Sequence, residues 1–216
     1  MRDEPPPGVC DIWVAQSEDA DRWAAWLPPA ERADVDRRRP GAGVYLTSRA
    51  LQRVAIAAYT GVEPHALTID RTCTRCGDRT HGRPTVRGGP PYSVTRTGPL
   101  VALAVVADGT VGIDAECVRP GADLTPLASL LGVAPTDTRT VLTAWLRHEA
   151  ALKARGTGIG DLWPVPAEAI RGIETVDLAL PGVVLAVATS RRVRRVRWTE
   201  AAPEGVMTQV RGPVAS

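Results

Sequence analysis

The amino-acid sequence predicts an α+β fold from three observations. Apolar residues recur at helical spacing within residues 46–58, and residues 136–155 predict a second long helix that a glycine ends. Two apolar stretches, residues 100–106 and 111–116, flank a short polar turn, which predicts an antiparallel hairpin. Further apolar stretches within residues 176–198 predict an antiparallel meander. The two halves of the chain thus share one order of elements, a helix followed by a pair of apolar strands.

The remaining elements follow in chain order. Residues 9–14 predict a short strand, and residues 17–27 predict a helix with Ser17 as its N-cap. Residues 30–39 begin another helix directly after two prolines. Residues 71–91 are rich in Gly, Thr, Arg and Pro and predict an ordered loop.

Composition limits the architecture further. A chain of 216 residues suits one large domain or two small ones. The sequence contains no Phe, so Val, Leu, Ile, Ala and a few Trp must build the core. We expect the domain boundary at the polar turn before residue 111, which gives an N-terminal α+β subdomain of residues 1–107 and a C-terminal one of residues 108–216.

Charge and hydropathy argue against several classes of protein. The formal net charge of +2 is too small to argue for bulk nucleic-acid binding. Apolar runs are too short to cross a bilayer, and the N-terminus lacks the apolar region of a signal peptide. We therefore expect a cytoplasmic, soluble monomer that binds neither membranes nor nucleic acid.

Four cysteines leave two interpretations open. Cys73 and Cys76 are three residues apart, and His81 follows closely, which is how a zinc site can begin. A second such pair is absent from the sequence, so Cys10 and Cys117 could complete a site only by folding onto the first pair. The alternative is a turn with free thiols in a reducing cytosol.

Two acidic clusters in the second half carry the strongest chemical signal. Asp114 and Glu116 are two residues apart, so on a strand they point to the same face. Glu149 and Lys153 are four residues apart, so on a helix they lie on one side and at least form a stabilising pair. Three carboxylates and a lysine suit Mg²⁺ that carries substrate phosphates, because Mg²⁺ takes oxygen ligands and a lysine can meet the remaining phosphate charge.

These clusters, with segments upstream, resemble the motifs of the 4'-phosphopantetheinyl transferase superfamily. The matching segments occur in the family's order: an arginine-bearing helix at residues 46–53, H-G-R-P at residues 81–84, a segment at residues 91–97, G-I-D-A-E at residues 112–116, and W-L-R-H-E-A-A-L-K at residues 145–153. The length resembles that of the two-domain, surfactin-synthetase-activating type.

The resemblance implies a reaction, a fold and partners. The reaction moves 4'-phosphopantetheine from coenzyme A, a co-substrate, to a serine of an acyl or peptidyl carrier protein, with Mg²⁺ as cofactor. Adenosine 3',5'-bisphosphate is released. The implied fold has two similar α/β subdomains related by a pseudo-twofold axis, with coenzyme A in the cleft between them.

The resemblance also implies roles for the acidic clusters. Asp114, Glu116 and Glu149 are implied as ligands of Mg²⁺, and Lys153 as the contact to the α-phosphate of coenzyme A. Glu149 is implied as the base that takes the serine proton, with a metal-bound water as the alternative. Holding the phosphates and neutralising the leaving group is most of what phosphoryl transfer requires.

A second set of residues is implied at the nucleotide end of coenzyme A. Arg53 and Arg83 are expected at the 3'-phosphate and adenine, with the backbone around Pro84 lining the adenine. Arg96 stands where the family has a histidine on the 3'-phosphate, and a guanidinium can grip phosphate with two hydrogen bonds. His148 stands where the family has a lysine beside the pyrophosphate, and histidine is mostly neutral at pH 7.

Two alternatives remain open at this stage. The substitutions at residues 96 and 148 allow a coenzyme-A-binding homologue of the same fold with altered or lost transferase activity. Cys73, Cys76 and the arginines of residues 191–197 also allow a non-enzymatic, zinc- and RNA-binding module. The basic stretch equally suits a solvated edge strand, because charged edges resist mispairing.

Overall fold

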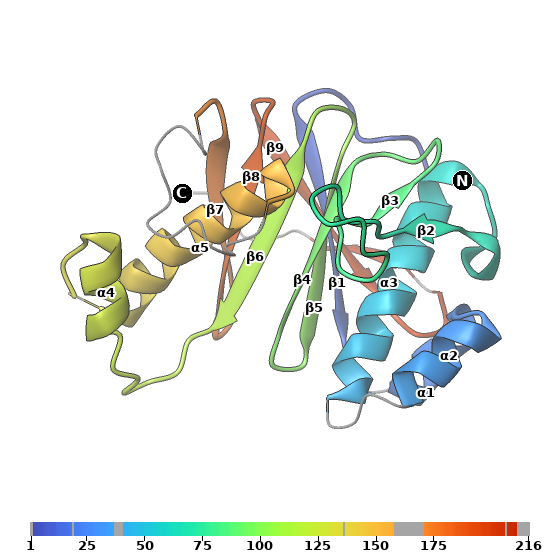
Figure 1. Ribbon diagram of the computed structural model, residues 1–216, viewed down its shortest axis with the longest axis horizontal. Helices are drawn as coiled ribbons and strands as arrows, with labels where there is room; N and C mark the ends of the chain where they lie inside the picture. The colour runs from blue at the N-terminus through green and yellow to red at the C-terminus, as the bar shows by residue number, and fades with distance from the viewer. Residues whose placement is uncertain are drawn as a thin grey trace.

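The computed structural model describes residues 2–18, 20–36, 41–135, 137–157, 171–205 and 207–210, which form a mixed α+β structure (Figure 1). Its helices are α1 (Ala20–Trp23), α2 (Pro29–Asp36), α3 (Ala42–Thr60), α4 (Thr125–Leu131) and α5 (Thr138–Arg155), with the 3-10 helices η1 (Ala24–Trp26) and η2 (Pro64–Ala66). Its strands are β1 (Val9–Gln16), β2 (Ile69–Asp70), β3 (Thr85–Val86), β4 (Tyr92–Thr97), β5 (Leu100–Val106), β6 (Val111–Cys117), β7 (Glu174–Leu180), β8 (Val183–Thr189), β9 (Arg195–Ala201) and β10 (Met207–Val210).

The described residues form three sheets, of which the smallest is the two-stranded pair of β2 and β3. The five-stranded sheet has the order β10-β9-β1-β5-β4, and the three-stranded sheet has the order β6-β8-β7. Strand β1 pairs antiparallel with β5 and parallel with β9. Figure 1 shows α3 lying against the larger sheet and α5 against the smaller one, with β4 and β6 next to each other where the sheets meet.

The core follows from the alternation of side chains along the strands. In β5, Val101, Leu103 and Val105 pack with α3, while Ala102 and Ala104 share a second cluster with β6 and β8. In β8 the alternation repeats, because its odd-numbered residues join that shared cluster and its even-numbered residues pack under α5. The two sheets therefore share one core, and each long helix covers the outer face of its own sheet.

The long helices confirm the sequence-based expectation. Helix α3 ends at Gly61, whose φ of 69° is left-handed. Helix α5 begins after Asp137, whose carboxylate accepts the Thr140 backbone N–H, and ends at Gly156 with a φ of 77°. The helix predicted at residues 17–27 is shorter, a single turn followed by η1. Residues 37–39 of the next predicted helix lie outside the described residues.

The predicted hairpin of residues 100–106 and 111–116 is wrong, although both strands exist. Strand β5 pairs with β1 on one side and β4 on the other, so neither of its edges is free for β6. Strand β6 pairs with β8 instead. The polar turn between them passes the chain from one sheet to the other.

The predicted meander is correct for β7 and β8, which pair antiparallel, and wrong for its third strand. Strand β9 joins the five-stranded sheet between β1 and β10, so the arginine-rich stretch is not an edge strand there. Asp11 of β1 is fully buried and accepts two hydrogen bonds from Arg197 of β9, at 2.5 and 2.7 Å. Tyr59 also donates to Asp11, at 2.7 Å. Pairing with this buried carboxylate explains why a basic residue lies inside the sheet.

Strand pairing does not follow the order of the two predicted subdomains. Strands β9 and β10 come from the second half of the sequence but extend the sheet built by the first half. The chain leaves the five-stranded sheet after residue 106 and returns to it at residue 195.

Candidate active site where the two sheets meet

The predicted site residues of β6 and α5 meet because Gly112 lets the helix lie directly on the strand. A Cβ atom at Gly112 would lie 1.9 Å from the Ala150 carbonyl oxygen and 2.5 Å from the Ala154 backbone nitrogen. Any side chain at this position would therefore push α5 off β6. The absence of a side chain at Gly112 therefore determines how close Glu149 and Lys153 come to the strand.

Asp114 lies at the centre of this contact. The Lys153 Nζ lies 2.5 Å from Asp114 Oδ1 and donates a second hydrogen bond to the Ile113 carbonyl oxygen at 3.1 Å. Thr95 on β4 donates its hydroxyl to the same Oδ1 atom, at 2.8 Å. The Asp114 side chain is 15% exposed and the Lys153 side chain 31%, so the pair is accessible from one side.

Strands β4 and β6 are joined by hydroxyl groups rather than by a backbone ladder. Ser93 accepts the Ile113 backbone N–H at 3.2 Å, and Thr97 accepts the Cys117 N–H at 2.9 Å. Thr97 also donates to Glu116 Oε2 at 3.1 Å. Sequence reasoning missed these contacts, although hydroxyls at every second residue are a pattern that places them on one face of a strand.

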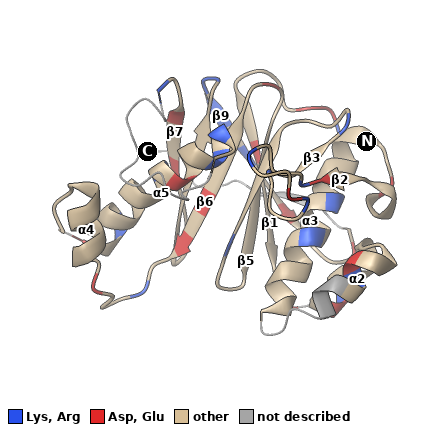
Figure 2. Ribbon diagram, viewed as in Figure 1, with Lys and Arg blue, Asp and Glu red and all other residues tan. Residues whose placement is uncertain are grey.

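Glu149 on α5 interacts electrostatically with both Asp114 and Lys153. Burial raises the pKa of this carboxyl, the Asp114 charge raises it further, and the Lys153 ammonium lowers it. Figure 2 shows the acidic residues of β6 and α5 on this part of the molecule and the basic residues of α3 on the other. A carboxyl whose pKa is raised by the charge of a neighbouring carboxylate suits a site completed by a cation.

The donor chemistry fits Mg²⁺, which prefers carboxylate oxygens together with water and phosphate oxygens. The oxygens of Asp114, Glu116 and Glu149 do not form a group of ligand atoms that all lie within 4.8 Å of one another; among the described residues such a group is made by Cys73, Cys76 and His81. In this state Lys153 supplies the positive charge next to Asp114.

Arg83 reaches the C-terminal end of α5 from the loop between β2 and β3. Its Nη1 donates to the Ala154 carbonyl oxygen at 3.3 Å, and burial lowers the pKa of its guanidinium. Gly82 lies against the backbone of residues 71–72, where a Cβ would come within 2.4 Å of Thr72. The turn therefore brings Arg83 to the last turn of α5, and Pro84 follows half-buried.

Arg96 points away from the carboxylates. It lies between Thr95 and Thr97 on β4, so its side chain faces α3, where its guanidinium sits 5.5 Å from the Tyr45 ring centroid. Arg49 donates to the Tyr45 hydroxyl at 2.6 and 3.0 Å. Burial lowers the pKa of Arg71, and the nearby Arg49 charge lowers it further. These arginines form a basic cluster suited to an anion, and the sequence had indicated only part of it.

The structure does not bring Arg53 to the site. Its side chain is 3% exposed and paired with Glu31, with Nη2 lying 2.6 Å from Oε1. Its Nη1 donates to the carbonyl oxygens of Pro64 and Leu67, at 2.9 and 2.7 Å. Arg53 therefore ties α3 to α2 and η2.

His148 and Trp145 share the site helix but have different surroundings. His148 Nδ1 donates to the Ala144 carbonyl oxygen at 2.9 Å, because a carbonyl can only accept. Trp145 is partly buried and packs against the core under α5.

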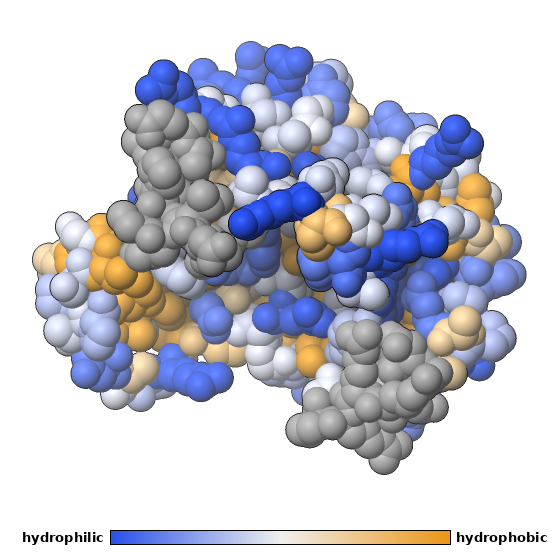
Figure 3. All heavy atoms as spheres, in the orientation of Figure 1, coloured by the Kyte–Doolittle hydropathy of each residue, from blue (hydrophilic) through white to orange (hydrophobic). Residues whose placement is uncertain are grey.

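The molecular surface agrees with a polar site. Figure 3 shows hydrophilic residues across the middle of the face that carries α5 and α3.

A cavity of about 180 Å³ lies elsewhere, between the loop before α4 and the start of α5. Among the described residues, the helices are too short or too polar to cross a membrane.

Comparison with known proteins agrees with these observations. No protein-family model matches the chain. The chain is 35% identical over 155 residues to the L-aminoadipate-semialdehyde dehydrogenase-phosphopantetheinyl transferase of Eremothecium gossypii. The match covers 63% of this chain and 54% of that protein, so the chain spans about half the length of this relative. By sequence, the chain is similar to a phosphopantetheinyl transferase.

Proposed function

We propose that this protein is a 4'-phosphopantetheinyl transferase, an enzyme that moves phosphopantetheine from coenzyme A to a serine of an acyl or peptidyl carrier protein. Adenosine 3',5'-bisphosphate is the released product. The proposal is supported by the similarity to a protein named as such a transferase. It is also supported by a site that offers carboxylates and a lysine at one place and arginines at another.

The observation that carries the proposal is the contact of α5 with β6 at Gly112. This contact brings Lys153 Nζ to 2.5 Å from Asp114 Oδ1. It also places Glu149 where the charges of Asp114 and Lys153 shift the pKa of its carboxyl. A helix held by backbone contact keeps its charged groups in fixed positions. Fixed positions matter here because phosphoryl transfer depends on positioning and charge neutralisation.

Asp114, Glu116 and Glu149 would hold Mg²⁺. When bound, Mg²⁺ supplies positive charge that neutralises the diphosphate and the leaving group. Lys153 can exchange its contact with Asp114 for a phosphate oxygen of coenzyme A. Glu149, whose pKa is raised, is the carboxylate suited to take the proton of the attacking serine.

The basic cluster around Tyr45 suits the 3'-phosphate of coenzyme A. Arg96 and Arg49 both lie within 5.5 Å of the Tyr45 ring, and the Arg49 charge disfavours the charged form of Arg71. A bound phosphate would relieve that repulsion. We assign Arg83 to the phosphates near Lys153, and we retain Pro84 and His148 as contacts to coenzyme A.

The proposal extends to the subtype, the subdomains and the oligomeric state of the enzyme. The protein is of the two-domain, surfactin-synthetase-activating type, with subdomains 1–107 and 108–216 related by a pseudo-twofold axis. It acts as a cytoplasmic monomer. The observation that each sheet carries one long helix supports this architecture.

The test is transfer itself. The protein is incubated with coenzyme A, Mg²⁺ and a set of apo carrier proteins, and each carrier is examined by intact-mass spectrometry. We expect one or more carriers to gain the mass of phosphopantetheine. Asp114→Asn and Glu149→Gln should abolish the gain, whereas Glu200→Gln, an exposed acid on β9, should leave it unchanged.

The alternative is a coenzyme-A-binding homologue with altered or lost transferase activity. It predicts that the protein binds coenzyme A in calorimetry while no carrier changes mass. If the protein neither binds coenzyme A nor transfers phosphopantetheine, both the transferase and the coenzyme-A-binding homologue are rejected.

A further inference from the structure

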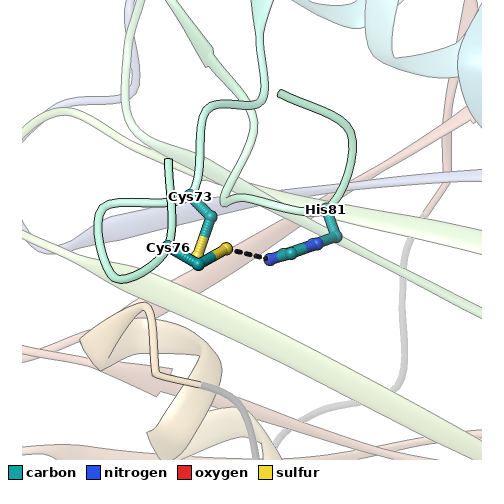
Figure 4. Close-up of side chains that lie close together, drawn as sticks. All are labelled: Cys73, Cys76 and His81. Atoms are coloured by element: carbon teal, nitrogen blue, oxygen red, sulfur yellow. Dashed lines mark hydrogen bonds between the residues drawn. The ribbon is translucent and has the colours of Figure 1, made fainter. Parts of the chain in front are cut away.

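The loop between β2 and β3 contains a group of metal-ligating side chains that the proposed transfer reaction does not use. The ligand atoms of Cys73, Cys76 and His81 all lie within 4.8 Å of one another. Figure 4 shows the Cys76 sulfur facing the imidazole, with Cys76 Sγ 3.2 Å from His81 Nε2, and the Cys73 side chain next to Cys76. Neither cysteine forms a disulfide. In a tetrahedral zinc site, neighbouring sulfur and nitrogen ligands are roughly 3.5–3.8 Å apart.

The backbone of this loop is arranged around Cys73. Its backbone N–H donates to the Asp78 carbonyl oxygen at 2.7 Å, and its carbonyl oxygen accepts the Gly77 N–H at 2.8 Å. The backbone N–H groups of Cys76 and Arg75 donate to its sulfur. Gly77 has a φ of 76° with open space around it, so this position needs glycine for its conformation.

The histidine has one ring nitrogen toward a sulfur atom and the other toward a carboxylate, the arrangement common for a metal ligand. Its Nδ1 lies 3.6 Å from Asp78 Oδ1, while its Nε2 faces Cys76. A carboxylate behind a histidine sets the tautomer that leaves the opposite nitrogen free for a metal. Asp78 is itself fixed, because Oδ1 accepts the Thr80 backbone N–H and hydroxyl, at 2.7 and 2.6 Å.

The loop also lacks the apolar contacts that would otherwise order it. Residues 71–84 contain no buried side chain. Short segments without a core are commonly held by a metal or a disulfide. Because thiolate and imidazole are soft or intermediate ligands, they favour zinc over the magnesium expected at the carboxylates.

We propose that Cys73, Cys76 and His81 bind a zinc ion whose fourth ligand is water, and that this ion fixes the turn that presents Arg83 to α5. The open fourth position follows from exposure, since Cys76 is exposed and the His81 side chain is 58% exposed. The zinc site stands apart from the proposed transfer reaction. Its test therefore does not depend on finding the carrier protein.

The first experiment measures zinc in the full-length protein, prepared without chelators under reducing conditions. We expect about one zinc ion per chain, the stoichiometry of a single mononuclear site. Cys76→Ser and His81→Ala should lose most of it. The matched controls Cys117→Ser and His65→Ala, which change a cysteine and an exposed histidine elsewhere, should retain it. Asp114→Asn should also retain it, which separates this site from the carboxylates.

The second experiment replaces zinc with Co²⁺, whose absorption reports its ligands. We expect a thiolate-to-cobalt charge-transfer band in wild type and in Cys117→Ser, and loss of this band in Cys76→Ser. Asp78→Asn should keep the band and weaken zinc binding about 10- to 100-fold, the usual effect of removing the carboxylate behind a histidine ligand. Zinc no higher in wild type than in Cys76→Ser, or a Cys73–Cys76 disulfide under these reducing conditions, would overturn the proposal.

Discussion

At the scale of single residues, Glu149 has the most informative acid–base behaviour. Its pKa is raised first by burial and then by the Asp114 charge, and it is lowered by Lys153. Asp114→Asn should therefore lower the pKa of Glu149, and Lys153→Met should raise it. Carboxyl-carbon NMR titration without added magnesium measures both shifts. Shifts of the same sign in the two variants would contradict the geometry.

The same pKa makes Glu149 costly to stability when ionised. Because its pKa is higher in the folded chain than in the unfolded chain, the folded state binds this proton more tightly. The stability it contributes is complete below the unfolded value and is lost as pH rises through the folded value. We expect Glu149→Gln to raise the thermal unfolding midpoint at neutral pH and to lose this advantage in acid. Glu200→Gln serves as the control.

Arg96 is expected to discriminate between coenzyme A and dephospho-coenzyme A, which lacks the 3'-phosphate. As a contact to the 3'-phosphate, it should contribute about 1.5–3 kcal/mol, or about 10- to 100-fold in affinity. Arg96→Ala should weaken coenzyme A by that factor and barely affect dephospho-coenzyme A in calorimetry. Arg87→Ala, which removes an exposed arginine elsewhere, should change neither. Tighter binding of coenzyme A by Arg96→Ala would identify the arginine as an obstruction.

At the scale of elements, the packing of α5 on β6 depends on one missing side chain. Gly112→Ala places a methyl group 1.9 Å from the Ala150 carbonyl oxygen, so the helix must move. Overpacking of this kind costs about 3 kcal/mol. We expect a lower urea midpoint together with loss of transfer, because Lys153 and Glu149 move with the helix.

A helical glycine elsewhere provides the matched control. A Cβ at Gly43 would lie 3.3 Å from the Ala20 Cβ, a contact that a small adjustment accommodates. Gly43→Ala should leave transfer unchanged. If Gly112→Ala also retains full transfer, the backbone contact does not set the site geometry.

Elements with a strong local pattern were predictable from the sequence, whereas their pairing was not. Residues 46–58 and 136–155 carry their own periodicity and end signals, so both helices were expected. The partner of β5 depends on β1 and β4, which lie elsewhere in the chain. Local sequence around the polar turn therefore suggested a hairpin that tertiary pairing replaces.

The candidate site was predictable to a similar degree. Asp114 lies on a strand and Glu149 and Lys153 on a helix, as the pattern predicted, but only the fold shows that Lys153 reaches Asp114. Arg53 was expected at the nucleotide but is buried against Glu31. Spacing along a helix shows which face a residue occupies, and only the fold shows what covers that face.

At the scale of the whole molecule, the pair of Asp11 and Arg197 ties the two ends of the chain into one sheet. Asp11 is fully buried and Arg197 is partly exposed, so removing Arg197 leaves a buried charge uncompensated, which costs about 3 kcal/mol. We expect Arg197→Ala to lower the free energy of unfolding in urea by about that amount. The control is Arg195→Ala, which removes an exposed arginine from the same strand. Equal effects of the two variants would assign the loss to strand β9 in general.

The meeting of β4 and β6 also bears on how the protein avoids aggregation. Each is the outermost strand of its sheet, and an uncovered outermost strand offers its backbone to other chains. Here the hydroxyls of Ser93 and Thr97 occupy backbone N–H groups of β6. Each sheet thus shields the vulnerable side of the other, and the same hydroxyl-lined contact that places the carboxylates also keeps both strands from recruiting a neighbouring molecule.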